Sequence, residues 1–164
     1  MKRFSLVAVA GAVALLAPLG AAASAQAAAS VSFTINEQIT LGPDGQPVLQ
    51  TFTATGPLCP KGTFFDTVQA TQPEPAQGPG HSGQFTLILR SVYTCDDGSG
   101  TFNALKELIV TITGPDTATA LGPIQLLGGT GAFTDLRGHG VDTGSIDVAA
   151  GKATGTDTGV VVRS

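Results

Sequence analysis

A small set of side chains has the types needed for acid–base chemistry, namely Tyr93, Arg137 and His139. Asp135, Arg137 and His139 alternate along the chain, so they share one face of an extended segment. Histidine can accept or donate a proton near neutral pH. One hypothesis is that Tyr93, Arg137 or His139 points into a cavity and protonates or orients a ligand. The alternative is that Arg137 and His139 are solvated edge residues and that Tyr93 spans core and surface.

Two Gly-rich segments could be mistaken for ligand sites. Residues 128–131, Gly-Gly-Thr-Gly, lack the Gly-Lys-Ser/Thr end and the following helix of a phosphate-binding loop. Residues 96–100, Asp-Asp-Gly-Ser-Gly, lack the alternating carboxylates and closing Glu of an EF-hand, and Asp-Gly is itself a turn signal. Both segments are therefore predicted to be turns between strands, and no metal site is expected.

The chain has two cysteines, Cys59 and Cys95. An even pair in an oxidising compartment usually forms a disulfide, and the alternative is a metal or redox pair. The two residues form no CxxC motif and have no nearby His pair, which disfavours a zinc site. The sequence therefore predicts a structural disulfide, whose loop of about 37 residues would contribute about 4 kcal/mol through chain entropy.

The first 27 residues have the three parts of a secretory signal peptide. Lys2 and Arg3 form a short basic start, an uncharged apolar run follows, and Ala25 and Ala27 form a small-x-small cleavage site. A transmembrane anchor is the alternative, but the apolar run is shorter than the roughly 20 residues that a span needs. We expect cleavage after Ala27, with Ala29 as an alternative, and a secreted protein without a membrane anchor.

Removing 27 of the 164 residues leaves 137, a length that suits a single domain at 28–164. Lys2 and Arg3 leave with the signal, so 6 basic residues remain against 12 acidic ones. A domain this acidic, without a Lys/Arg cluster, is a poor ligand for phosphate backbones. Nucleic acid is therefore not an expected partner.

The mature region favours an all-β fold with little helix. Segments rich in β-branched residues alternate with Gly, Pro and Asp turns, which is typical of a sandwich or barrel. An exposed, irregular loop is expected at residues 71–83, which contain His81, and one helical turn at 132–136. Eight strands suffice for a closed barrel whose interior holds side chains or one small ligand. The expected strands span residues 31–41, 48–55, 62–70, 84–95, 101–113, 118–127, 138–148 and 154–163.

The segment from Gly128, Gly129, Thr130, Gly131 and Phe133 to Gly138 resembles the Gly-rich element of the allene oxide cyclase and dirigent barrels. The repeated Gly-Thr-Phe that follows each cysteine is similar to secreted bacterial proteins placed beside that superfamily. The resemblance implies an eight-stranded antiparallel, calycin-type β-barrel with an apolar lumen. It further implies cyclisation or coupling of reactive lipid-like or phenolic molecules without a cofactor, and frequent association into homo-oligomers.

Three functions follow from these observations. The first is a secreted barrel that binds a small apolar molecule in its lumen. The second is a cofactor-independent cyclase, isomerase or stereo-directing protein. The third is an extracellular structural or interaction domain with a packed barrel. The first two predict a cavity lined by apolar side chains, and the enzyme adds a few convergent polar groups such as Tyr93 or His139.

Overall fold

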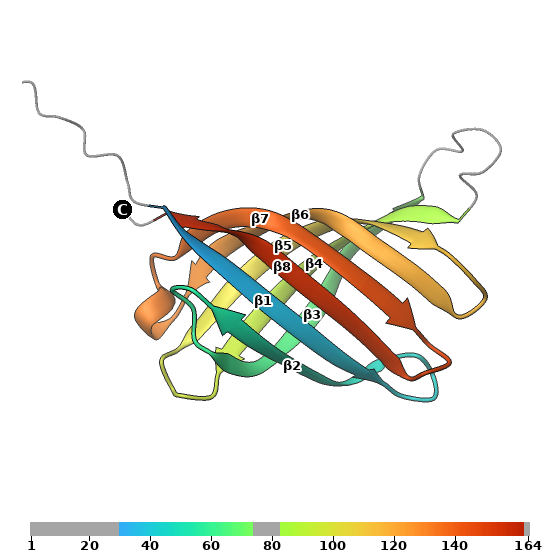
Figure 1. The fold of residues 1–164 in the computed structure, drawn as a ribbon, viewed down its shortest axis with the longest axis horizontal. Helices are drawn as coiled ribbons and strands as arrows, with labels where there is room; N and C mark the ends of the chain where they lie inside the picture. The colour runs from blue at the N-terminus through green and yellow to red at the C-terminus, as the bar shows by residue number, and fades with distance from the viewer. Residues whose placement is uncertain (1–29, 74–82, 163–164) are drawn as a thin grey trace, which may run out of the picture.

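The computed structural model describes residues 30–73 and 83–162, which form one closed antiparallel barrel with its strands in chain order (Figure 1). The strands are β1 (Ser30–Leu41), β2 (Pro47–Thr55), β3 (Lys61–Pro73), β4 (Gln84–Cys95), β5 (Thr101–Ile112), β6 (Thr117–Gly129), β7 (Arg137–Asp147) and β8 (Lys152–Val162). A short 3-10 helix, η1 (Gly131–Phe133), follows β6. The expected signal peptide, its cleavage site at Ala25 and Ala27, and His81 lie outside the described residues. Within the described ranges, no helix is long and apolar enough to cross a membrane.

The predicted all-β, eight-stranded barrel with little helix is confirmed. Its strands form because apolar residues alternate with polar ones, which matches the two-residue period of a sheet with one buried face. In β1, for example, Phe33 and Ile35 are buried whereas Thr34 and Asn36 are not. β1 pairs with β8 from Ser30 to Thr40, and this pairing closes the barrel.

The seam between β2 and β3 is much shorter than the others. These strands pair only at three positions, Thr51 with Thr63, Phe52 with Gly62, and Thr53 with Lys61. Beyond them the strands are joined by a side chain, since Gln50 Oε1 accepts a hydrogen bond of 3.1 Å from the Asp66 backbone N–H. The wall of the barrel is therefore split along part of its length. We call this region the β2–β3 split.

The two ends of the barrel differ in their connections. One end holds the Cys59–Cys95 disulfide, η1 and the start of β1, and we call it the disulfide end. The opposite end, which we call the far end, carries the connections at residues 42–46, 113–116 and 148–151. Figure 1 shows these two ends at the left and right of the view.

Two strands are longer than the sequence indicated. β3 runs to Pro73, so residues 71–73 belong to a strand and pair with β4, whereas residues 74–82 of the expected loop are outside the described residues. Proline is tolerated there because this part of β3 has no ladder with β2 that its missing N–H would break. β6 includes Gly128 and Gly129, so the Gly-rich segment is partly strand. A Cβ on Gly129 would overlap the Thr101 backbone, which explains the need for glycine at this close approach.

Candidate functional site

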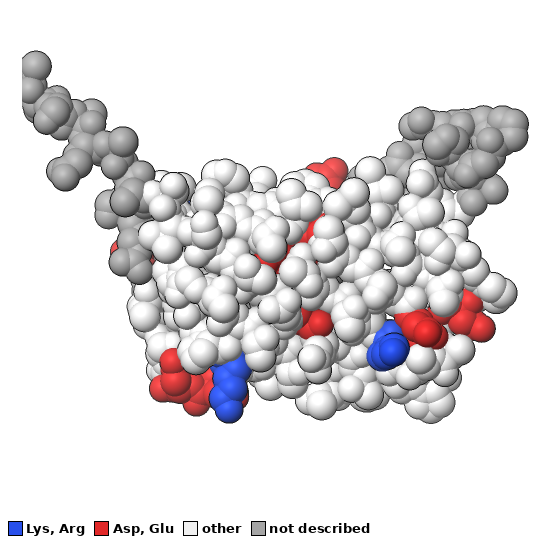
Figure 2. Space-filling view, in the orientation of Figure 1, with Lys and Arg blue, Asp and Glu red and all other residues white. Residues whose placement is uncertain are grey.

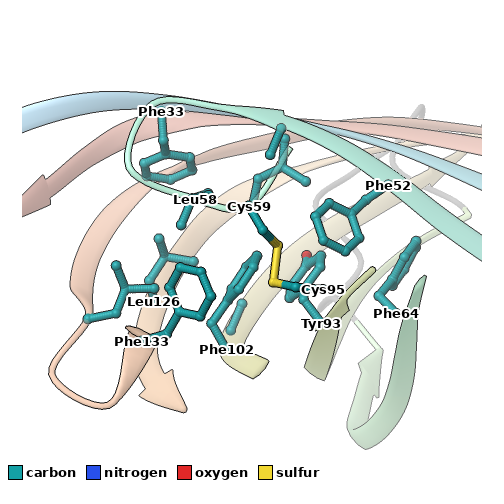
Figure 3. Close-up of a cluster of buried hydrophobic side chains, with 14 of the residues drawn as sticks. Phe33, Phe52, Leu58, Cys59, Phe64, Tyr93, Cys95, Phe102, Leu126 and Phe133 are labelled. Carbon is teal, nitrogen blue, oxygen red and sulfur yellow. A yellow bond between two sulfur atoms is a disulfide. The ribbon is translucent and has the colours of Figure 1, made fainter. Parts of the chain in front are cut away.

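Aromatic side chains fill the lumen at the disulfide end (Figure 3). Tyr93 lies at the centre of this group, with its ring stacked on Phe102 at 4.5 Å between centroids and edge-on to Phe52 at 5.2 Å. The predicted disulfide between Cys59 and Cys95 is confirmed and joins the β2–β3 connection to the end of β4. This half of the lumen is thus a packed core, and a disulfide bond closes its end.

Most of the side of the molecule seen in Figure 2 is uncharged, yet several charged side chains are buried in the middle of the lumen. Lys106 Nζ lies 2.7 Å from Glu37 Oε1, 2.7 Å from Asp142 Oδ2 and 3.1 Å from Asp157 Oδ2. The Tyr93 hydroxyl donates a hydrogen bond to Glu37 Oε1 and lies 3.4 Å from Asp157 Oδ2. We call these five residues the ionic floor, because they end the aromatic core.

Burial and neighbouring charges set the protonation of the ionic floor. Burial raises the pKa of Asp157, Lys106 lowers it, and Glu37 and Asp142 raise it again, to about 9. Asp157 is therefore protonated at neutral pH, and a hydrogen bond to Asp142 favours this form. Burial alone would lower the pKa of Lys106, but the surrounding oxygens raise it well above its ordinary value. Burial also raises the pKa of Tyr93, which stays a neutral donor.

The three acids of the floor have the geometry of a cation site. One carboxylate oxygen from each of Glu37, Asp142 and Asp157 lies within 4.8 Å of the others. Lys106 Nζ contacts all three residues, so its ammonium group takes the position that a metal ion would need. The arrangement therefore works as an internal ion cluster built around lysine.

Asp66 extends the polar region toward the far end. Ser91 Oγ donates a hydrogen bond of 2.6 Å to Asp66 Oδ1. Burial raises the pKa of Asp66 to about 6, and the Ser91 hydrogen bond offsets part of that rise. Asp66 therefore changes charge close to neutral pH, which suits a group that exchanges a proton or meets a charged ligand.

A cavity of about 100 Å³ occupies the lumen between the ionic floor and the far end. Its polar lining includes Glu37, Asp66, Lys106 and Asp142. The rest of the lining is mainly aliphatic and is contributed by Ile39, Leu87, Leu89, Leu108, Val110, Ala120, Ile146 and Ala153. An apolar chamber with a few convergent polar groups is the usual form of a small-molecule site.

Small residues on β7 and β8 leave room for this arrangement. Gly155 faces Glu37, and a Cβ on Gly155 would lie 2.7 Å from Glu37 Oε2. Gly144 and Ala153 also line the cavity and contribute little volume. Gly144 on β7 and Gly155 on β8 therefore make space for the floor and the cavity.

The structure separates the three side chains first considered for acid–base chemistry. Tyr93 is fully buried, and its hydroxyl belongs to the ionic floor. Arg137 and His139 have exposed side chains on β7, and Arg137 donates a hydrogen bond to the Leu136 carbonyl at 2.6 Å. Asp135 is also exposed. Of this group, only Tyr93 lies in the lumen.

Sequence reasoning missed the other members of the ionic floor and Asp66. The sequence did show that most of these residues alternate in step with the buried apolar positions of their strands. Glu37 follows Phe33 and Ile35 at the same parity in β1. Lys106 likewise shares the phase of buried Phe102 and Leu108 in β5. A charged residue on the apolar face of a strand was therefore the available signal, since such residues are almost never buried without a partner.

Comparison with known proteins adds no relative. No family model, curated protein or solved structure matches this chain.

Proposed function

We propose that this protein is secreted and binds a small, mainly apolar molecule in the far half of its lumen. The observation that carries the proposal is the cavity of about 100 Å³, with aliphatic walls and an ionic floor. A disulfide is typical of proteins from oxidising compartments and supports export. The acidic balance of the chain also fits a small-molecule ligand better than a nucleic acid.

The test fills the cavity without touching its polar groups. Ala120 lines the cavity and Thr119 is exposed beside it on β6, so Ala120→Leu and Thr119→Leu form a matched pair. Native mass spectrometry of protein from its own culture medium should find a bound molecule of defined mass in the wild type and in Thr119→Leu. Ala120→Leu should lack it. An identical ligand-free mass for all three, after exposure to short-chain amines, alcohols and carboxylic acids, would instead favour a packed structural domain.

A second candidate function is a cofactor-independent cyclase or isomerase. Asp66 favours it, because this cavity residue has a pKa of about 6 and could transfer protons near neutral pH. The resemblance of residues 128–140 to allene oxide cyclase and dirigent barrels supports the same candidate, and the barrel topology is compatible with it. Conversion of the bound molecule to an isomer, lost in Asp66→Asn even at a ligand concentration that saturates the variant, would establish this function over simple binding.

A further inference from the structure

The hydrogen-bond donors of the ionic floor are already used within the protein. Lys106 directs its ammonium group to three carboxyl groups, at 2.7, 2.7 and 3.1 Å. The Tyr93 hydroxyl donates to Glu37, and the Ser91 hydroxyl donates to Asp66. These donors therefore have little capacity left for a ligand that needs to accept hydrogen bonds.

Acceptor oxygens remain where the donors are exhausted. Among the described residues, neither Glu37 Oε2 nor Asp66 Oδ2 has a hydrogen-bond partner. Both residues line the cavity, and the Glu37 side chain is only 5% exposed. Among the described residues, the fully buried side-chain oxygen without a partner is Asp157 Oδ1, whereas Glu37 Oε2 and Asp66 Oδ2 keep some surface open to the cavity. The far half of the lumen thus offers acceptors to whatever enters it.

The balance of charge favours a cation. Besides protonated Asp157 in the floor, the cavity is lined by one ammonium group, on Lys106, and by three acidic side chains, Glu37, Asp66 and Asp142, so acidic groups outnumber the cation. In a low-dielectric chamber this excess attracts a positive group and repels a carboxylate such as the head of a fatty acid.

The size of the cavity limits what can lie beside the floor. A cavity of about 150 Å³ holds the six carbon atoms of benzene, so about 100 Å³ holds roughly four or five non-hydrogen atoms. The aliphatic wall suits a narrow hydrocarbon chain.

We propose that the ligand is an alkyl amine or a molecule with such an arm. Its ammonium group would lie against Glu37 and Asp66, and its carbon chain would point toward the far end. This inference rests on the proposed lumen binding and specifies the chemistry of that site.

Three probes of equal length test the head group, namely butylamine, butan-1-ol and butyrate. Each is titrated into the mature, disulfide-bonded protein at pH 7.5 and constant ionic strength, with amide NMR shifts as the readout. Butylamine should bind at least tenfold more tightly than the other two. Its shifts should centre on residues that line the cavity, and Ala120→Leu should abolish them.

Matched variants test the two acceptors. Glu37→Gln keeps an oxygen that can accept from Tyr93 and Lys106, and Asp66→Asn keeps one for Ser91. Each should weaken butylamine binding about tenfold while changing butan-1-ol binding less than twofold. Asp116→Asn removes an exposed carboxylate at the far end and should change neither affinity by more than twofold.

Lowering the pH provides an independent readout. Between pH 7.5 and pH 5, Asp66 takes up a proton, so wild-type affinity for butylamine should fall while that of Asp66→Asn changes much less. The groups that act on Asp66 in this range are Glu37 from β1, Ser91 from β4, Lys106 from β5 and Asp142 from β7.

The outcomes separate this inference from the proposed function. If butan-1-ol or butyrate binds the lumen as tightly as butylamine, and Ala120→Leu abolishes that binding, lumen binding stands and the amine is wrong. If Glu37→Gln, Asp66→Asn and Asp116→Asn weaken butylamine equally, the selectivity comes from overall charge and the assigned contacts are wrong. If none of the probes shifts cavity residues, both proposals fail.

Discussion

The two halves of the lumen are filled by side chains of different chemistry. At the disulfide end, the space inside the strands is filled by aromatic rings and closed by Cys59–Cys95. Beyond Tyr93, the same lumen contains an ammonium group, several carboxyl groups and a cavity of about 100 Å³. The first half resembles an ordinary core, in which every large side chain touches others. The second half resembles a binding site.

This contrast indicates that the barrel needs only half of its lumen for stability. Aromatic packing provides burial and ring contacts without unpaired polar groups. A buried ion cluster, in contrast, is weak evidence for stability, because desolvation can exceed the attraction between the charges. We infer that the ionic half is kept for function, and that the aromatic half and its disulfide offset its cost.

Replacing Lys106 should have the largest effect on the ionic half. Lys106→Met leaves the carboxyl groups of the floor buried without their cation, so the free energy of unfolding should fall by about 5 kcal/mol at pH 7. The loss should shrink at acidic pH, where those carboxyl groups become neutral. Urea unfolding at both pH values measures it.

The matched control is Lys61→Met at the disulfide end. Lys61 lies 4.0 Å from Asp96, and both side chains are more than half exposed, so the stability change should be below about 0.5 kcal/mol. Equal losses for the two lysines would show that the buried cluster has no special role in the fold.

Removing the disulfide should have the next largest effect, on the aromatic half. The double change Cys59→Ser and Cys95→Ser should cost about 4 kcal/mol, because the unfolded chain regains the entropy of a loop of about 37 residues. Binding of butylamine at the other end should persist in protein that remains folded. If binding disappears while the fold persists, the two halves are coupled and the division proposed above is wrong.

Asp157 offers a third test, through the pH dependence of stability. Its pKa is about 9 in the folded protein and near 3.8 in the unfolded chain, so between these values only the folded state binds this proton. Stability should therefore fall as pH rises, by up to about 1.4 kcal/mol per pH unit for one proton. Asp157→Asn mimics the protonated acid and should remove this slope, becoming the more stable protein at pH 8.

Thermal unfolding from pH 5 to pH 8 measures the difference, with exposed Asp116→Asn as the control. Parallel profiles for the wild type and Asp157→Asn would mean that Asp157 is charged in the folded state. The charge balance invoked for the ligand would then be wrong as well.

The barrel was accessible from sequence because its main determinants are local. Alternating residues such as Phe33 and Ile35 indicate a strand with one buried face, and the number of strands limits how the sheet can close. Strand ends were less accessible. Pro73 stays in β3 only because β2 has already diverged from it, and that divergence depends on pairing across the barrel.

The assembled site was not accessible because its residues come from early, middle and late strands of the chain, and only the closed barrel brings them together. Glu37, Lys106, Asp142 and Asp157 come from β1, β5, β7 and β8, and each looks like an ordinary surface charge until its strand phase is known. A one-residue error in register would move each of them to the outer face. His139 illustrates the difficulty. Its residue type suggested acid–base chemistry, but its position in the alternation of β7 places its side chain on the outer face, not in the lumen.

The smallest expected effect concerns the β2–β3 split, where the two halves of the lumen meet the wall. Gln50→Leu removes the acceptor of the Asp66 N–H and should cost about 1 kcal/mol, whereas Gln125→Leu, on the exposed face of β6, should be nearly neutral. Hydrogen exchange at the Asp66 amide is the sharper readout and should accelerate several-fold in Gln50→Leu alone, because the neighbouring β3–β4 ladder leaves this N–H to the β2 side. An unchanged rate would mean that β4 alone holds this part of β3. Gln50 would then not hold β2 and β3 together at the split. Entry of a ligand between these two strands, through the side of the barrel, would become the route to test.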